Sequence, residues 1–216
     1  MGLLFEIYIK NDNNMKYIDL KSKIKTSYFT PLDIIQAGFA YSSLSISRWV
    51  KQQLIRKIKK GLYVFSDMEK TLDIKELASL VVEPSYLSLE SALWMAGLIP
   101  EVVFGTTCIT TKSPIDYRTY LGSITYRHLS PGLFFGYLSV ASKNKSYYLA
   151  EPEKALLDYL YLTSSIDNRD AVLELRIDPD NFNHLNQNKI DQYLTVFDNK
   201  RISHIIAQMR KIYARD

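Results

Sequence analysis

The stretch SISRWVKQQLIRKIKKGLYVF, residues 45–65, decides how the N-terminal part of this chain is interpreted. Its first half continues a helix that starts at Ser42 and extends to about Gln52. Two short runs of β-forming residues follow, LIRKI and LYVF, and the glycine-containing turn at residues 59–61 joins them. Such a pair of runs predicts a β-hairpin directly after the helix.

The residues before this stretch extend the pattern toward the N-terminus. Thr30 is a suitable N-cap, Pro31 suits a first helical position, and Asp33 suits the positive end of a helix. Gly38 can end that helix in a left-handed conformation. Its core-facing residues are expected to be Leu32, Ile34 or Ile35, and Ala37.

An earlier helix from Met15 to about Lys25 and a short extended piece at residues 28–29 complete the series. The order helix, strand, helix, helix and hairpin is typical of a winged helix-turn-helix. In the helix after Ser42, the residues expected to pack inward are Leu44, Ile46, Trp49 and Val50. Those expected on its other faces are Ser45, Ser47, Arg48, Lys51 and Gln52.

Charge is unevenly distributed along the 216 residues. Residues 1–66 hold 11 Lys and Arg against 4 Asp and Glu, a net charge of +7, whereas residues 67–216 hold 16 against 19, a net charge of −3. No acidic residue occurs from Ile34 to Ser66. A basic N-terminal domain joined to a mildly acidic body indicates that the first domain faces a polyanion.

The basic hairpin and the polar helix together predict contact with duplex DNA. A helix in the major groove needs short polar side chains and cations, and a wing needs basic residues at its tip. Arg48 is the best candidate for bidentate contact with guanine, and Thr30 with the following amides could hold a phosphate. The candidate contacts are Thr30, Ser42, Ser43, Ser45, Ser47, Arg48, Lys51, Arg56, Lys57, Lys59 and Lys60.

The polar segment SDMEK, residues 66–70, marks the domain boundary, so we expect one domain over 1–66 and a second over 67–216. Amphipathic patterns predict helices from Asp73, from an N-cap at Ser88, and from Glu151. Segments rich in Val, Ile, Thr and Tyr predict antiparallel strands between them. Residues 164–185 are poorly patterned, and helices over 187–197 and 200–213 close the chain. The expected class is α+β, a winged helix-turn-helix followed by a mixed domain and C-terminal helices.

The residues 45–65 resemble the N-terminal winged helix of the AbiEi family of antitoxins, and two downstream segments resemble the same family. These segments are EPSYLSLESALWMAGLIPE, residues 83–101, and YLAEPEKALLDYLYL, residues 148–162. The resemblance covers about residues 28–163. It implies a bacterial autorepressor that binds inverted repeats at its own promoter. It also implies an antitoxin domain, without a catalytic motif, that counteracts a nucleotidyltransferase-like toxin.

Other chemistries find little support in the sequence. The single Cys108 and the dispersed His128, His184 and His204 form no metal-binding pattern, and no nucleotide-binding glycine motif occurs, so no cofactor is expected. We interpret the acid–lysine cluster as the start of a helix with a solvated face, and not as a nuclease site. It comprises Glu151, Glu153, Lys154 and Asp158.

We therefore expect a non-enzymatic, cytoplasmic protein without a membrane segment. Three alternatives stay open. The chain could be a stand-alone winged-helix regulator without a toxin partner. It could be an enzyme directed to nucleic acid by the winged helix. It could also be a protein-interaction module that binds a toxin directly.

Overall fold

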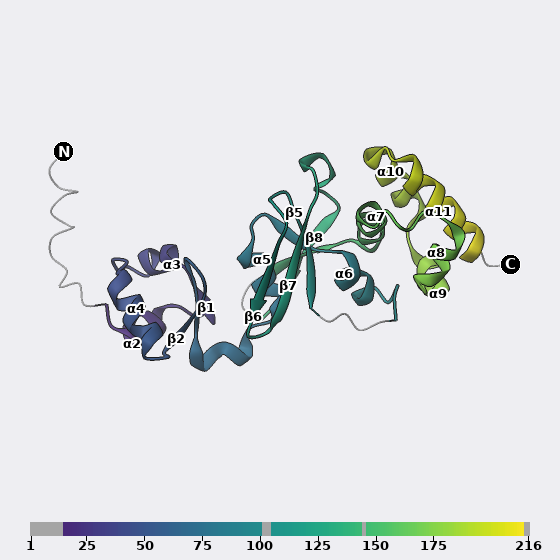
Figure 1. Cartoon of the computed structure of the whole chain (residues 1–216). Coiled ribbons are helices and arrows are strands. Elements are labelled where there is room, and N and C mark those ends of the chain that lie inside the picture. The colour runs from purple at the N-terminus through teal and green to yellow at the C-terminus, as the bar shows by residue number, and fades with distance from the viewer. Residues whose placement is uncertain (1–14, 101–104, 144–145, 214–216) are drawn as a thin grey trace, which may run out of the picture. The chain divides into compact units, whose positions relative to one another are not determined.

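The computed structural model describes residues 15–100, 105–143 and 146–213 (Figure 1). Contacts within the chain divide it into two compact units, Met1–Leu72 and Asp73–Asp216. Each unit has its own hydrophobic core.

The N-terminal unit contains the elements predicted from the sequence, in the predicted order. They are α2 (Tyr17–Lys23), β1 (Tyr28–Phe29), α3 (Pro31–Gln36), α4 (Ser43–Lys51), β2 (Ile55–Lys59) and β3 (Leu62–Phe65). The 3₁₀ helix η1 (Ser66–Thr71), which was not predicted, follows them. The three strands form an antiparallel sheet in the order β1-β3-β2. Gly61 turns the hairpin with a φ of 81°, a left-handed conformation that glycine adopts without a steric penalty.

The phase of helix α4 differs from the prediction. Ile46 and Trp49 are buried as expected, and the Trp49 ring packs edge-on against the Tyr17 ring, with 5.7 Å between the ring centroids. Ser45 is also buried, whereas Leu44 is 78% exposed. Because 45, 46 and 49 share one face of a 3.6-residue helix, position 44 falls on the opposite face. The inward placement of Leu44 and the outward placement of Ser45 were therefore wrong.

Helix α3 shows a similar difference. Ile34 is fully buried, but Leu32 and Ile35 are 60% and 57% exposed. A helix of six residues can turn only a narrow stripe to a small core, and here Ile34 supplies it. The expectation that Leu32 faces the core was wrong.

The segment SDMEK belongs to the first unit. Asp67 forms an ion pair with Lys21, and Glu69 pairs with Arg56 at 2.6 Å between Oε1 and Nε. Met68 packs against the hydrophobic core of the same unit. These contacts fold the segment back as η1, so the division falls after Leu72 instead of after residue 66.

The second unit is built on a six-stranded mixed sheet in the order β6-β7-β5-β4-β9-β8. Its strands are β4 (Ser85–Leu87), β5 (Thr106–Thr110), β6 (Ile115–Thr119), β7 (Gly122–His128), β8 (Tyr137–Ala141) and β9 (Ser146–Ala150). The pairs β5–β7 and β4–β9 are parallel, which corrects the expectation of antiparallel strands alone. Strands β8 and β9 pair in the expected antiparallel direction. Residues 102–104, which belong to the segments expected to form strands, and residues 144 and 145 lie outside the described residues.

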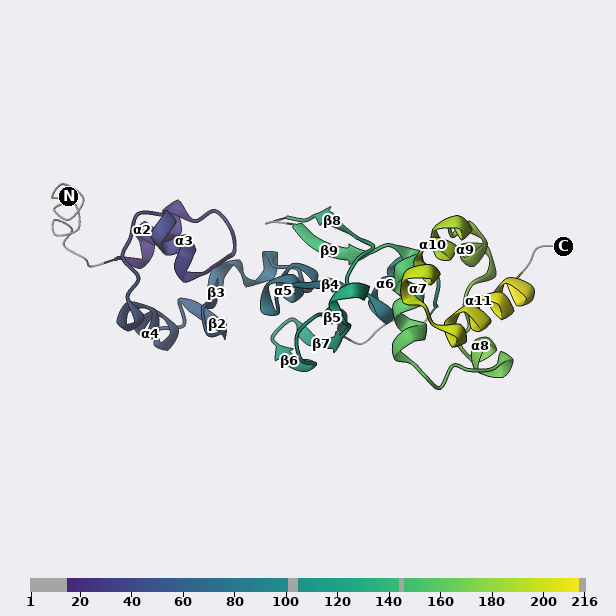
Figure 2. The same ribbon diagram turned by 90° about the horizontal axis from the view of Figure 1, so that it is seen from above.

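Helices cover both faces of this sheet (Figures 1 and 2). Helix α5 (Ile74–Val81) lies on one face, and α6 (Leu89–Met95) and α7 (Pro152–Leu162) lie on the other. Helices α8 (Arg169–Glu174), α9 (Pro179–His184), α10 (Gln187–Phe197) and α11 (Lys200–Tyr213) stack beyond α7. The bounds of α10 and α11 match the prediction, whereas α8 and α9 occupy the poorly patterned stretch. None of the described helices has both the length and the apolar character needed to cross a bilayer.

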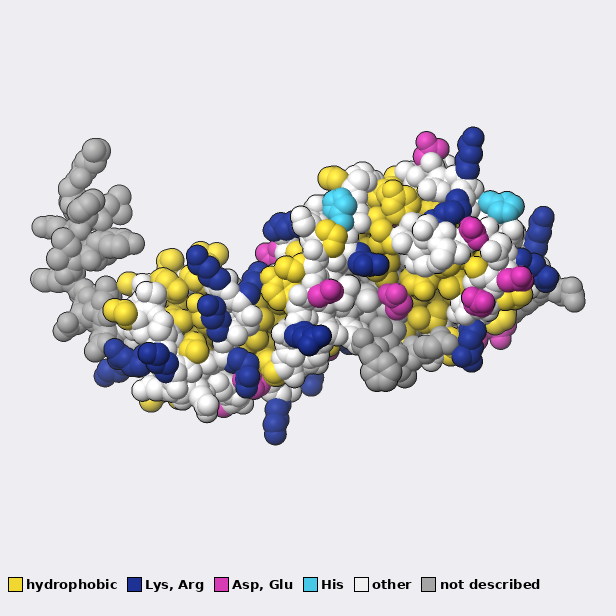
Figure 3. All heavy atoms as spheres, viewed as in Figure 1, with side chains coloured by type: hydrophobic (Ala, Val, Ile, Leu, Met, Phe, Trp, Pro, Cys, Tyr) yellow, Lys and Arg dark blue, Asp and Glu magenta, His cyan; other side chains and the backbone are white. Residues whose placement is uncertain are grey.

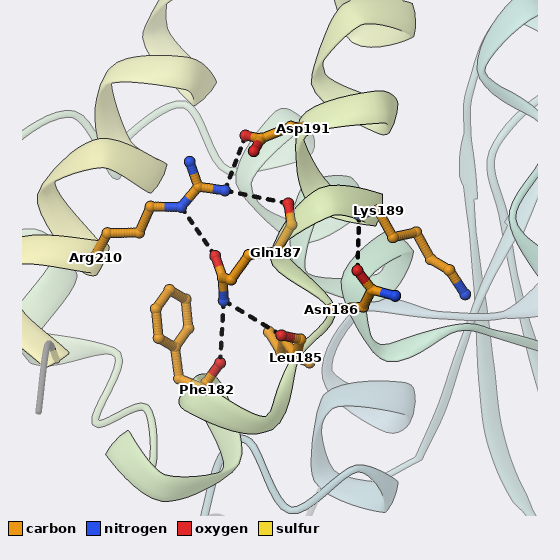
Figure 4. A network of polar contacts seen from close by, with 7 residues as sticks. All are labelled: Phe182, Leu185, Asn186, Gln187, Lys189, Asp191 and Arg210. Carbon is orange, nitrogen blue, oxygen red and sulfur yellow. Dashed lines mark hydrogen bonds and ion pairs between the residues drawn. The ribbon is translucent and has the colours of Figure 1, made fainter.

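A polar network holds α10 and α11 together (Figure 4). The Arg210 Nε donates to Gln187 Oε1 at 2.9 Å, and its Nη2 contacts Asp191 Oδ1 at 2.9 Å. Gln187 in turn donates weakly to the Phe182 carbonyl at 3.5 Å, at the end of α9. The last helix is thereby tied to the two helices before it.

The start of α7 is held to α10 by Glu151, and this contact makes stability depend on pH. Lys189 Nζ lies 2.9 Å from Glu151 Oε1, and the Tyr193 hydroxyl donates to Oε2. Partial burial raises the pKa of Glu151, but these two contacts outweigh it and hold the pKa below 4.5. A carboxyl group whose pKa is lower in the folded state stabilises the fold at pH values above its unfolded pKa. This stabilisation is lost as the pH falls through its folded pKa.

Glu151→Gln is therefore expected to lower the free energy of unfolding by about 1–2 kcal/mol at neutral pH. The difference from the parent should shrink as the pH falls below about 4.5. Urea unfolding of the parent and the variant from pH 7 down to about pH 3 measures this difference. Glu174→Gln, at an exposed position, is the matched control. A deficit that stays constant down to pH 3 would contradict the assigned ion pair.

Candidate nucleic-acid interface

Helix α3 begins with a capping box that uses the Thr30 side chain. Thr30 Oγ1 accepts from the Asp33 amide at 3.4 Å, and the Thr30 amide donates to Asp33 Oδ2 at 2.7 Å. The Thr30 hydroxyl also donates to Asp33 Oδ2 at 2.7 Å. The N-cap prediction is confirmed. Because the Thr30 amide and hydroxyl both donate to Asp33 Oδ2, these two donors are already used within the helix cap and Thr30 is a poor phosphate ligand.

Helix α4 presents a polar face outward because its other face is anchored in the core. Ser42 caps it by accepting from the Ser45 amide at 3.2 Å. Ser43, Ser47, Arg48 and Lys51 are exposed, as predicted for a helix that reads DNA. Ser45 is 8% exposed and turned to the core, so its side chain is not available for a base edge.

The hairpin brings only some of its cations toward the turn. Lys59 pairs with Leu62 directly beside the turn, and a register shift separates it from Lys57. Lys57 and Lys60 are exposed and Lys59 is half-buried. Arg56 lies further along β2, opposite Val64, and its guanidinium binds Glu69 in two places. The placement of Arg56 at the wing tip was therefore wrong.

The charge of this surface is uncompensated within the described residues. No carboxylate occurs on α4 or on the hairpin. Asp33 belongs to the α3 cap, and Asp67 and Glu69 pair with cations elsewhere in the unit. Four exposed cations form no ion pair with any described residue: Arg48, Lys51, Lys57 and Lys60. In the view of Figure 3, Lys and Arg predominate on the N-terminal unit, whereas acidic side chains gather on the second.

The second unit contains a buried polar cluster that the sequence interpretation missed. Lys154 Nζ donates to the Tyr86 hydroxyl at 2.9 Å and forms an ion pair with Asp158. The Tyr86 and Ser88 hydroxyls donate to Asp158 Oδ2 at 2.9 and 2.8 Å. All four residues are fully buried. The expectation of a solvated face was wrong for Glu153, Lys154 and Asp158, which are all buried. Ser88 stands at the N-cap, but its side chain makes no capping hydrogen bond.

Aromatic rings surround the Lys154 ammonium of this cluster. Lys154 Nζ lies 5.0 Å from the Phe135 ring centre and 5.1 Å from that of Phe197. A Cβ on Gly136 would come within 3.0 Å of Lys154 Cγ, so glycine is required there. Burial lowers the pKa of Lys154 and raises that of Asp158, and their pairing opposes both shifts. The cluster therefore joins β4, the start of α6 and α7 in the core of the second unit.

One signal for this burial was present in the sequence. Lys154 and Asp158 are four residues apart, and the residues that surround them on α7 are Ala155, Leu156, Leu157 and Leu160. A helix that is apolar on nearly every side is a buried helix, so its charged residues must be buried as a pair.

The histidines and the single cysteine form no metal site within the described residues. Among the described residues, no three His, Cys, Asp or Glu side chains come close enough to hold a metal ion. His128, His184 and His204 are all exposed. Cys108 is fully buried in β5 as a small core residue, and this burial raises the pKa of its thiol.

Comparison with known proteins bears on the fold. No family model matches the chain, and no curated protein matches it. Among solved structures, it is similar to the crystal structure of the RV2827C protein from Mycobacterium tuberculosis, with 14% identity and a TM-score of 0.51. The match covers 91% of this chain and 79% of that protein, and it shows a shared α+β fold.

Proposed function

We propose that the N-terminal unit is a winged helix-turn-helix that binds duplex DNA, with α4 in the major groove and the β2–β3 hairpin as the wing. The observation that carries this proposal is the exposed face of α4 and the hairpin, where four cations lack a carboxylate partner among the described residues. A surface of this charge attracts phosphates, and its short serines leave room for base edges.

We further propose that the chain is an autorepressor and an antitoxin that counteracts a nucleotidyltransferase-like toxin. The support is the resemblance of residues 45–65, 83–101 and 148–162 to the AbiEi family. In the fold, the last two segments meet through the buried cluster, because Tyr86 comes from one and Lys154 from the other. The second unit then serves antitoxicity, and the first serves repression.

Salt dependence tests the DNA-binding proposal. The full chain is titrated with the duplex immediately upstream of its own gene at increasing NaCl. Three phosphate contacts, by Lys51, Lys57 and Lys60, predict a slope of about −2.7 for log K against log salt, or about fortyfold weaker binding between ~50 and ~200 mM. Binding that is equally tight at both concentrations would contradict the proposed interface.

Co-expression tests the antitoxin proposal. We expect the gene next to this one to encode the nucleotidyltransferase-like toxin, and we expect the parent chain to restore the growth of cells that produce it. Arg48→Ala/Lys51→Ala should still restore growth but should no longer repress a reporter under the upstream promoter. If neither chain restores growth while the parent still represses, the protein is a stand-alone regulator.

A further inference from the structure

Leu44 stands out among the apolar residues of the N-terminal unit. Its exposed fraction of 78% is the highest among the exposed large apolar side chains of the described residues. The core of the unit is complete without it, since Ile46 and Trp49 anchor α4. Leu44 therefore adds little to the packing of the unit, and its side chain is free to contact a partner.

The neighbours of Leu44 indicate the nature of that contact. Residues three, four and seven positions later lie on the same helix face, which places Leu44 beside Ser47, Arg48 and Lys51. All three are exposed, and no carboxylate occurs on the helix. An apolar side chain within a cationic face fits a polyanion that also presents apolar groups.

Duplex DNA is such a polyanion. In the major groove, thymine presents its C5-methyl group to apolar side chains, and guanine presents O6 and N7 to arginine. Side chains four residues apart on a helix are separated by about 6 Å, which corresponds to about two base-pair steps of 3.4 Å. Leu44 and Arg48 can therefore contact base pairs about two steps apart.

We propose that Leu44 reads a thymine methyl group in the major groove, within about two base pairs of a guanine bound by Arg48. This inference rests on the proposed DNA-binding function and makes it specific. Leu44 is then a specificity residue, and the serines and lysines beside it position the helix.

The test compares thymine with deoxyuridine, which pairs identically but lacks the C5-methyl group. The tightest duplex that the full chain selects from a random library is synthesised in both forms. The parent is expected to bind the thymine form about fourfold more tightly, the effect of burying one methyl group. Leu44→Ala should bind both forms equally, at the parent's affinity for the deoxyuridine form.

Ile18→Ala is the matched control, because Ile18 on α2 is 76% exposed. It should retain the parent's preference for the thymine form. Both substitutions remove exposed side chains, so circular dichroism should show unchanged folding.

Several outcomes would overturn the inference. A Leu44→Ala chain that keeps the thymine preference shows that another residue contacts the methyl group. A loss that is equal on both duplexes, together with lost cooperativity, shows instead that Leu44 contacts a second copy of the chain. Both leave the proposed function standing. If the parent selects no duplex at all, the proposed function fails as well.

Discussion

Lys154→Met is expected to lower the free energy of unfolding by about 3–5 kcal/mol, because it leaves the Asp158 carboxylate buried without its counter-charge. Asp158→Leu should lower the free energy of unfolding by a similar amount, because it leaves the Lys154 ammonium buried without a counter-charge. Water cannot compensate either charge, because both side chains are fully buried. Urea unfolding followed by circular dichroism measures both losses.

The double variant Lys154→Met/Asp158→Leu should be far less unstable than the two single variants together. Replacing a buried ion pair by apolar residues of similar size is often neutral, so we expect a loss within about 2 kcal/mol. Part of that loss comes from the Tyr86 and Ser88 hydroxyls, which lose their acceptor.

Lys189→Met provides the matched control for this cycle. It breaks an ion pair with Glu151 whose side chains are 33% and 15% exposed, so water can replace the lost contact. Its loss should stay near or below about 1 kcal/mol. Two results would show that the two charges are not coupled in the core. One is a loss of stability for Lys154→Met and Asp158→Leu that is no larger than for Lys189→Met. The other is a loss for the double variant that equals the sum of the two single losses.

Arg48→Ala/Lys51→Ala is expected to weaken binding to the selected duplex by at least about tenfold and to reduce discrimination at one base pair. A bidentate arginine–guanine contact accounts for about 1–3 kcal/mol of discrimination. Binding to duplexes in which the guanine is replaced in turn, measured by fluorescence anisotropy, locates the affected base pair.

Lys57→Ala/Lys60→Ala should act differently. Phosphate contacts carry no sequence information, so these two substitutions should weaken binding to all duplexes alike. They should also make the slope of log K against log salt shallower by about 2. Lys112→Ala/Lys211→Ala removes the same charge from exposed positions on the second unit and should leave the slope unchanged. Equal effects of all three pairs would show that binding depends on net charge alone.

The sequence by itself determined the local elements of this protein. The capping residues Thr30 and Ser42 define where α3 and α4 begin, and Gly61 defines the hairpin turn. The bounds of α10 and α11 also followed from pattern alone. These features depend on neighbours a few residues apart, and both the residues and their spacing are visible in the chain.

Only the tertiary structure decided which side chains stay available. Arg56 is paired by Glu69, 13 residues away, and Ser45 is turned to the core by the packing of Trp49. Lys154 is buried against Tyr86, 68 residues away. Such partners meet only when the sheet orders its strands, because burial and pairing depend on long-range contacts that local periodicity does not encode.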